Sequence, residues 1–157
     1  MRIKTKGKLS IMKSLNHLVL VIFAAALLSM TSTLYAANAK EYEDHIIYYN
    51  AFPTDSLPPE MTKQYGLKRS KNYAMLNISV MEKGSGIPTG VKSKVTGTLK
   101  NLMGQTRNLE FREIKEANAV YYIAQIGVQS KEVVNFNIDI RPEGTDLKYD
   151  IAFSKKF

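Results

Sequence analysis

The sequence of 157 residues contains no cysteine and no tryptophan. Without cysteine the chain can form no disulfide bond, and it lacks the lipid-bearing cysteine that follows the leader of a bacterial lipoprotein. Of the two histidines, only His45 lies beyond the first 39 residues. A transition-metal site usually needs several His or Cys ligands, and a Ser–His–Asp triad would depend wholly on His45. We therefore expect His45 to be an ordinary strand-surface histidine, and we predict no metal, no cofactor and no catalytic residue.

Sequence motifs for nucleotide binding and nucleophilic catalysis are also absent. The Gly84-Ser-Gly86 stretch, followed by Gly90, lacks the order of a phosphate-binding loop and leads into a predicted strand rather than a helix. There is no G-x-S-x-G sequence that would place a nucleophilic serine. We interpret residues 83–90 as a flexible connection between two strands.

One acidic stretch, Leu109–Glu116, offers three carboxylates, Glu110, Glu113 and Glu116. General acid–base catalysis would need two of them to converge on one cleft. We favour instead a solvated hairpin in which Glu110 pairs with Arg112 and a bulge lies near Glu113, because the alternation of apolar residues slips there. A carboxylate-dependent hydrolase is the least favoured function.

The N-terminal segment has the pattern of a secretory signal peptide. Five basic residues and no acidic one precede an unbroken apolar run, Leu18–Leu28, and Ala37-Asn-Ala39 follows as a cleavage motif. An uncleaved anchor is the alternative, but eleven apolar residues fall short of the roughly 20 that cross a bilayer. We predict residues 1–39 to be the signal peptide and 40–157 to be one periplasmic domain.

Two details of this leader stay open. Cleavage after Ala39 places Ala37 at the −3 position, whereas cleavage after Ala36 would place the bulky Leu34 there. The basic segment is also long, so translation could start at Met1 or at Met12.

The net charge of +8 is dominated by the leader. The leader holds five of the 22 Lys and Arg residues, which leaves 17 against 14 Asp and Glu, or +3, in the mature domain. That balance is ordinary for a protein surface. We expect no nucleic-acid partner, and no membrane association after cleavage.

Apolar and polar residues alternate with period two along most of the mature chain, which is typical of antiparallel strands with one buried face. Seven strands are predicted: 43–51, 72–82, 91–101, 107–115, 119–126, 131–141 and 146–154. Thr54–Gly66 breaks the period and is predicted to be one short helix, with Ser56 or Asp55 as its cap and Gly66 at its end. We predict an all-β fold, an immunoglobulin-like antiparallel β-sandwich.

The segment Tyr65–Lys71 is the candidate contact site. It joins the predicted helix to the second strand and concentrates Lys68, Arg69 and Lys71 beside Tyr65. A basic loop on a rigid scaffold can bind an acidic peptide, a phosphate or an anionic sugar. We name Tyr65, Arg69 and Lys71 as the candidate partner-binding residues.

Several segments resemble an uncharacterised exported gammaproteobacterial family, domain-of-unknown-function family 4426. The resemblance spans nearly all of the mature chain and rests on Asn50–Glu60, Tyr65–Lys71, Leu76–Val80, Gly97-Thr98, Asn101-Leu102, Leu109–Glu113 and Arg141–Gly144. It implies a small periplasmic β-sandwich, and it brings no activity, cofactor or catalytic residue.

The sequence therefore favours a non-enzymatic interaction module of the cell envelope, which would present loops or an edge strand to another envelope protein. The alternative is a domain that binds a small ligand or a cell-wall glycan through tyrosines and the basic loop. The oligomeric state is open.

Overall fold

The computed structural model describes residues 38–84 and 86–157, and these form an all-β domain with two short helical segments. The predicted leader lies outside the described residues except for Asn38 and Ala39. The elements in chain order are β1 (Asn38–Glu41), β2 (His45–Pro53), η1 (Thr54–Ser56), α2 (Pro59–Gln64), β3 (Tyr73–Glu82), β4 (Thr89–Gly90), β5 (Ser93–Asn101), β6 (Thr106–Asn108), β7 (Arg112–Glu116), β8 (Ala119–Gly127), β9 (Val133–Pro142) and β10 (Tyr149–Lys156).

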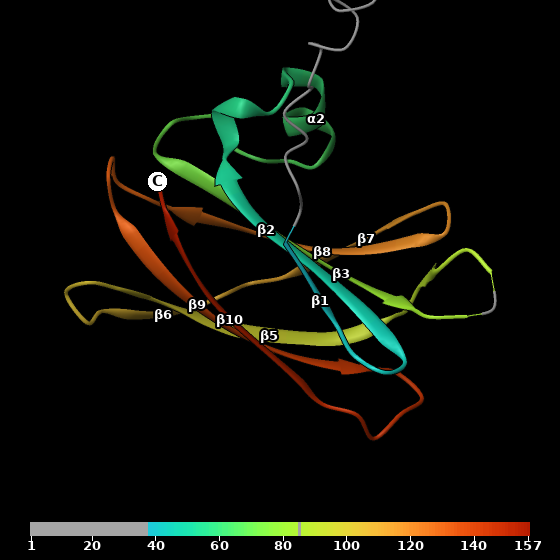
Figure 1. Cartoon of the computed structure of the whole chain (residues 1–157). Helices are drawn as coiled ribbons and strands as arrows, with labels where there is room; N and C mark the ends of the chain where they lie inside the picture. Colours follow the sequence, from blue (N-terminus) through green and yellow to red (C-terminus); the bar gives the residue numbers. More distant parts are fainter. Residues whose placement is uncertain (1–37, 85) are drawn as a thin grey trace, which may run out of the picture. The chain divides into compact units, whose positions relative to one another are not determined.

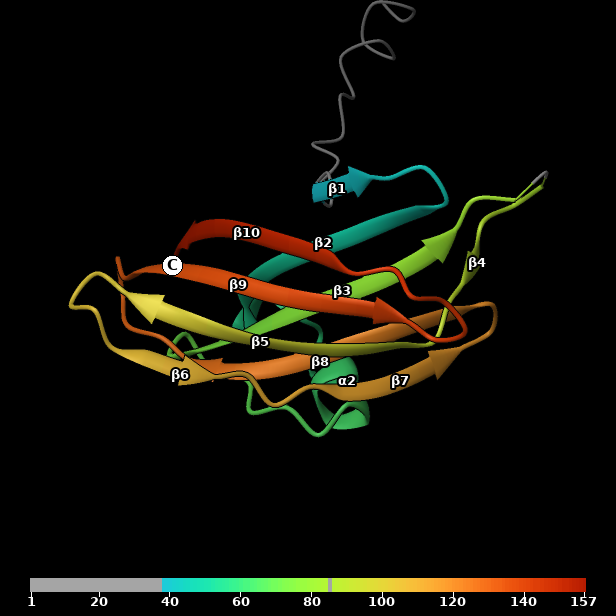
Figure 2. The same ribbon diagram turned by 90° about the horizontal axis from the view of Figure 1, so that it is seen from below.

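Two antiparallel sheets pack face to face, so the predicted β-sandwich is confirmed (Figure 1). The six-stranded sheet has the order β1-β2-β3-β8-β7, with β4 paired to β3, and the four-stranded sheet has the order β10-β9-β5-β6. Figure 2 views the domain from the side of the four-stranded sheet.

The core lies between the sheets and consists largely of the apolar residues that alternate with polar ones along the strands. Ile47, Leu76 and Ile78 of the six-stranded sheet meet Phe136 and Ile138 of the four-stranded sheet, and each is at most 2 % exposed. Successive residues of a strand point to opposite faces, so the polar residues between them face outward. Burial of this apolar surface is the main stabilising contribution.

The prediction of a single strand over 107–115 is wrong, because this segment forms two strands that belong to different sheets. β6 pairs with β5 in the four-stranded sheet, whereas β7 pairs with β8 in the six-stranded sheet. Residues 109–111 cross between the sheets, and Leu109 is buried in the core on the way. The slip in alternation that suggested a bulge near Glu113 therefore marks a change of sheet.

The predicted helix over 54–66 is shorter than expected and divided. η1 and α2 are separated by Leu57 and Pro58, and Pro59 occupies the first helical position of α2, where proline is tolerated. Gly66 follows with a φ of 60°, as predicted for a residue that ends a helix. The pair lies on the outer face of the six-stranded sheet (Figure 1), where Leu57 and Leu67 pack on Met75 and Ile123.

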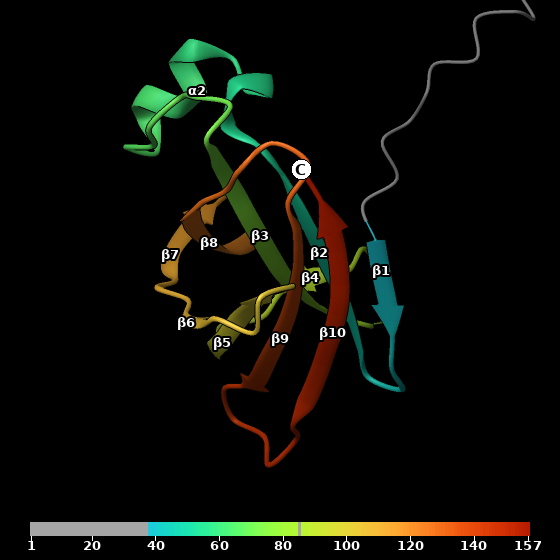
Figure 3. The same cartoon turned by 90° about the vertical axis from the view of Figure 1, so that its left-hand side faces the viewer.

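β1 and the turn after it close one side of the sandwich, where β2 and β10 lie near each other (Figure 3). Lys40 Nζ and the Tyr42 hydroxyl donate to the Asp150 carbonyl oxygen of β10, at 3.3 and 3.4 Å, and the Tyr42 and Tyr149 rings lie 4.1 Å apart. The predicted domain start at Lys40 falls inside β1, since Asn38 and Ala39 already pair with Tyr49 and Tyr48.

The expectation of a surface histidine is wrong. His45 is 3 % exposed, and its Nδ1 lies 2.9 Å from the hydroxyl oxygen of Tyr149, 104 residues along the chain. This strand position was predicted to be exposed, but Tyr149 of β10, which belongs to the facing sheet, covers it. His45 is thus part of the cross-sheet contact with Tyr149.

Within the part of the chain that the structure describes, no helix has both the length and the apolar character needed to cross a membrane.

Candidate functional site

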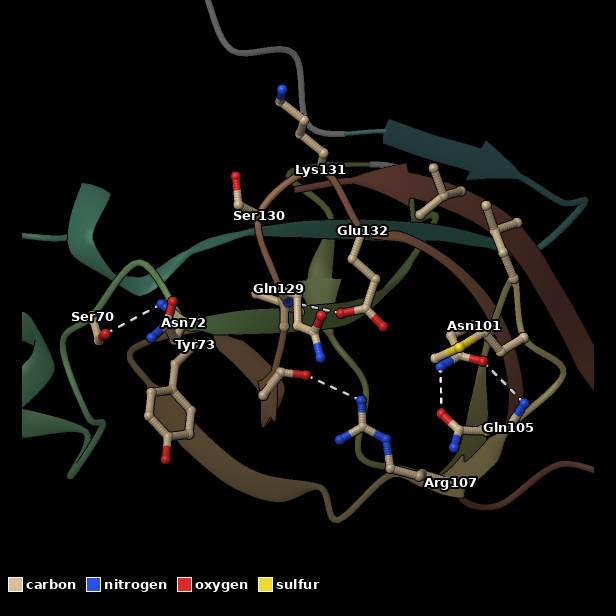
Figure 4. A pocket seen from close by; sticks show the side chains of 15 residues that line it. Ser70, Asn72, Tyr73, Asn101, Gln105, Arg107, Gln129, Ser130, Lys131 and Glu132 are labelled. Atoms are coloured by element: carbon tan, nitrogen blue, oxygen red, sulfur yellow. Dashed lines mark hydrogen bonds between the residues drawn. The ribbon is translucent and has the colours of Figure 1, made fainter.

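A groove of about 820 Å³ opens at one end of the sandwich (Figure 4). Three segments far apart in the sequence line it: the end of the basic loop and the start of β3, the β5–β6 hairpin, and the β8–β9 loop. These connections lie together at one end of the domain (Figure 1), at the opposite end from the β3–β4 and β9–β10 connections. Most lining side chains carry amide, hydroxyl or charged groups, so the groove suits a polar ligand or a polar protein segment.

Thr54 positions the first of these segments. Its side chain is fully buried, and its hydroxyl oxygen lies 2.7, 3.0 and 3.2 Å from the carbonyl oxygens of Lys68, Ser70 and Tyr73. The same oxygen accepts a hydrogen bond from the Ser70 N–H at 3.0 Å. One hydroxyl, on the first residue of η1, therefore fixes the loop that contributes to a groove wall.

The second and third segments are braced by polar contacts. In the β5–β6 hairpin the Asn101 amide donates to Gln105 Oε1 at 2.7 Å and its Oδ1 accepts from the Gln105 N–H at 3.0 Å. Arg107 Nη2 donates across to the carbonyl oxygen of Gly127 at 3.0 Å. The groove is therefore held by local hydrogen bonds before any ligand arrives.

The chain's last residue supports the β8–β9 loop. The Lys131 N–H donates to the Phe157 oxygen at 2.7 Å, and the Phe157 N–H donates to the Glu132 carbonyl oxygen at 2.9 Å. The Phe157 side chain packs against the core. The backbone and side chain of Phe157 are therefore part of the support of this loop.

Two exposed apolar side chains stand at the groove. Leu102 and Met103, at the tip of the β5–β6 hairpin, are 75 and 77 % exposed and belong to its lining. Adjacent exposed apolar side chains rimmed by polar groups can mark an interaction site, and methionine is enriched at protein interfaces. Ile87, in the β3–β4 connection at the other end of the domain, is 89 % exposed and provides a comparison.

The three candidate contact residues lie in different environments. Arg69 donates through Nε to the Leu57 carbonyl oxygen at 3.0 Å and through Nη2 to the Asp55 carbonyl oxygen at 2.6 Å, so its guanidinium fastens η1 and the segment after it. Lys71 is exposed, and its neighbours Ser70 and Asn72 line the groove. Their role in partner binding stays a prediction, and Lys71 is the one best placed for it.

Tyr65 anchors α2 to β7. Its hydroxyl donates to Glu116 Oε1 at 2.5 Å, and its carbonyl oxygen accepts from Arg112 Nη2 at 2.5 Å. The hydrogen bond to Glu116, followed by burial, raises the pKa of Tyr65 from 10.0 to about 12. This contact has a structural role that the sequence did not predict.

This raised pKa predicts a pH dependence of folding. The folded chain holds the Tyr65 proton more tightly than the unfolded chain, so the free energy of unfolding should fall as the pH rises from 10 towards 12. Glu116→Gln removes the carboxylate, and the fall should become shallower. Urea unfolding of both proteins at several pH values measures how steeply the free energy of unfolding falls in each. Tyr122, whose pKa is raised to about 12 mainly by burial, contributes to the fall in both proteins, so its effect cancels when the two slopes are compared. Equal slopes would contradict the assignment.

The three carboxylates of the acidic stretch do not come together. Glu116 bonds to Tyr65 on the outer face of the sheet, whereas Glu113 accepts a 3.3 Å hydrogen bond from the Tyr122 hydroxyl and pairs with Lys115 at 3.4 Å. Glu110 is exposed, and the expected pair with Arg112 is replaced by the bond from Arg112 to Tyr65. The geometry gives the hydrolase hypothesis no support.

No group of three or more His, Cys, Asp or Glu side chains that could hold a metal ion occurs among residues 38–84 and 86–157.

Comparison with protein families decides the affiliation. The family model described as Domain of unknown function (DUF4426) matches residues 39–157. The chain belongs to this family. No curated protein gives a significant match.

Solved structures support the same fold for this DUF4426 protein. A DUF4426 family protein from Pseudomonas aeruginosa PAO1 is 31 % identical, with a TM-score of 0.67, and the match covers 79 % of this chain and 96 % of that one. FetP from uropathogenic Escherichia coli strain F11, expressed in the periplasm, is 14 % identical with a TM-score of 0.56, covering 78 % of this chain and 93 % of that one. A copper-bound variant of FetP is 14 % identical with a TM-score of 0.54, and the match covers 78 % of this chain and 95 % of that one. The likeness to FetP extends to the fold alone.

Sequence reasoning missed most of the groove. Of its lining residues, only those next to Lys71 were in or near a predicted site. Asn101, Gln105, Arg107, Gln129 and Glu132 lay in predicted turns or at the ends of predicted strands, and no role was predicted for them. Loops from three distant segments form the groove, and no spacing in the sequence signals that they meet.

Proposed function

We propose that this DUF4426 protein is an exported, non-enzymatic interaction module of the cell envelope, and that the groove at the end of its sandwich is the docking site. The observation that carries the proposal is the groove itself, a polar depression braced from within and bordered by the exposed Leu102 and Met103. Export is supported by the leader pattern of the sequence.

The charges near the groove favour a partner segment with acidic and apolar residues. Arg107 and Lys131 belong to the groove lining, and Lys71 lies in the chain between the lining residues Ser70 and Asn72. Lys68 Nζ lies 5.4 Å from the centre of the ring of Tyr73, which is also a lining residue. Against these cations stands one lining carboxylate, Glu132. Complementary charge speeds association and orients the partner, while desolvation of the apolar tip contributes affinity.

Cross-linking with affinity capture in intact cells tests this proposal. Because Phe157 is part of the fold, the affinity tag is inserted after Gly84, where the surroundings are open. The double variant Leu102→Ser and Met103→Ser should lower the recovery of the main cross-linked envelope protein at least tenfold. Leu147→Ser, at an apolar residue 38 % exposed in the β9–β10 connection, is the matched control and should leave it unchanged. Equal recovery from the tip variant and the control would contradict docking at the groove.

A second candidate function, glycan binding, is favoured by one feature of the same groove. The Tyr73 ring lines it beside the amides of Asn72 and Gln129, and an aromatic ring next to amides can stack on and hydrogen-bond to a sugar. In that case soluble cell-wall fragments should raise the melting temperature, because a ligand that binds the native state stabilises it. The absence of any shift at millimolar concentration would count against a glycan.

A further inference from the structure

Two groups of opposite charge line the groove without pairing with each other. Arg107 belongs to β6, and Glu132 lies directly before β9. Figure 4 shows the two side chains entering the groove from opposite walls, with their charged ends toward its centre. Neither takes part in any of the ion pairs that the described residues form. A cation and a carboxylate thus face the same space.

Each of these groups is held by one backbone contact. Arg107 Nη2 donates to the Gly127 carbonyl oxygen at 3.0 Å, and Glu132 Oε2 accepts from the Gln129 N–H at 2.7 Å. The guanidinium has further N–H donors, and the carboxylate has a second oxygen, Oε1. These remaining atoms make no hydrogen bond to the described residues. The contacts orient both groups in advance, which lowers the entropy lost when a ligand binds.

The residues nearby add polarity but no competing charge. The Gln129 amide lies between Arg107 and Glu132 in Figure 4, and it can donate or accept. Lys131 also belongs to the lining, but its ammonium points away from the groove in the same view. The middle of the groove therefore presents one cation, one anion and an amide.

We infer that this part of the groove binds a zwitterionic ligand, a free amino acid or short peptide that carries both an ammonium and a carboxylate. The ligand carboxylate lies on Arg107, whose planar donors match a carboxylate, and the ammonium lies on Glu132. The inference rests on the proposed function in that it uses the same groove, and it specifies the chemistry recognised inside it.

Titration of the purified domain by calorimetry tests this inference with three probes: alanyl-alanine, its N-acetyl form and its C-terminal amide. The free dipeptide should bind, and each blocked form, which lacks one charge, should bind at least tenfold more weakly. Arg107→Gln and Glu132→Gln should each weaken the free dipeptide at least tenfold. In the Glu132→Gln variant the new amide oxygen can still accept from the Gln129 N–H, so that loop contact is preserved. Lys94→Gln, at an exposed lysine of β5 that does not line the groove, is the control and should leave binding unchanged.

Three results would overturn the zwitterion site: equal binding of a blocked dipeptide, unchanged binding in either variant whose melting curve matches that of the parent, or no binding of the free dipeptide at millimolar concentration. These results are separate from the fate of the proposed function. Partner capture that depends on Leu102 and Met103 could persist without dipeptide binding, and dipeptide binding could persist without partner capture.

Discussion

Thr54→Val should lower the free energy of unfolding by about 2 kcal/mol, because it removes the hydrogen bonds that a fully buried hydroxyl makes to the backbone of the 68–73 loop. The Thr54 hydroxyl can donate to one carbonyl at a time, and the shortest contact is to Lys68 at 2.7 Å. It also accepts from the Ser70 N–H at 3.0 Å. Valine has the same shape but can neither donate nor accept. The Ser70 N–H therefore loses its partner, while the Lys68 carbonyl oxygen keeps only the hydrogen bond from Gln125 Nε2 at 2.8 Å.

Thr62→Val is the matched control for this substitution. Thr62 is also buried, and its hydroxyl has a single local partner, the Pro59 carbonyl oxygen at 2.8 Å in the first turn of α2. We expect that variant to lose less than about 1 kcal/mol. Urea unfolding measures both values. Losses of the same size in the two variants would show that Thr54 has no special role in fixing the 68–73 loop.

Gly90→Ala should destabilise the domain by about 2–3 kcal/mol through a backbone collision. A Cβ atom at Gly90 would lie 2.6 Å from Val120 N and 2.8 and 2.9 Å from two backbone atoms of Ala119. None of these atoms can move without shifting the start of β8. The Gly90 N–H also donates to the Asn118 carbonyl oxygen at 2.7 Å, and a separation of the strands would weaken that bond.

Gly84→Ala, in the same connection between β3 and β5, provides the comparison. A Cβ atom at Gly84 would meet nothing within 4 Å, so the change should alter stability by no more than about 0.5 kcal/mol. Thermal unfolding separates the two variants, since 2–3 kcal/mol corresponds to a fall in Tm of roughly 10 °C for a domain of this size. A Gly90→Ala protein as stable as Gly84→Ala would contradict the close approach of β4 and β8.

The sequence predicted the strands whose burial is one-sided. In β9 the buried Val134, Phe136, Ile138 and Ile140 alternate with more exposed residues, and period-two burial leaves a direct trace in the sequence. β1 left no such trace, because all four of its residues are exposed and it is held through backbone pairing with β2. The absence of a buried face explains why no strand was predicted at β1, whereas the first predicted strand, 43–51, corresponds to β2.

The sequence could not predict contacts that depend on how distant segments meet. His45 is covered by Tyr149, and Thr54 is satisfied by carbonyl groups 14 to 19 residues away. From the sequence alone, polar residues at such positions are predicted to be exposed, because the facing sheet or the loop that covers them is far away along the chain. Arg69 shows the same limitation. Its place in a basic loop suggested contact with a partner, but in the structure its guanidinium donates hydrogen bonds to two carbonyl oxygens of its own chain.

The structure places the end of the basic loop at the groove. Ser70, whose carbonyl oxygen Thr54 contacts, lines the groove together with Leu102 and Met103 of the hairpin, and Lys71 follows Ser70 in the chain. A partner at this end of the domain could contact the loop and the hairpin together, as loops at the end of a β-sandwich do in other binding domains. The sequence-based hypothesis of an interaction module thus acquires a specific surface.

The most direct test of this account is site-specific photo-cross-linking in living cells. A photoreactive amino acid replaces Met103 in one strain and Ile87 in another, since both side chains are largely exposed apolar groups at opposite ends of the domain. Antibodies against the protein detect the products, which avoids a tag. We predict a discrete adduct with an envelope component from position 103 and none of the same mass from position 87. Identical adducts from both positions, or an adduct from position 87 alone, would contradict docking at the groove.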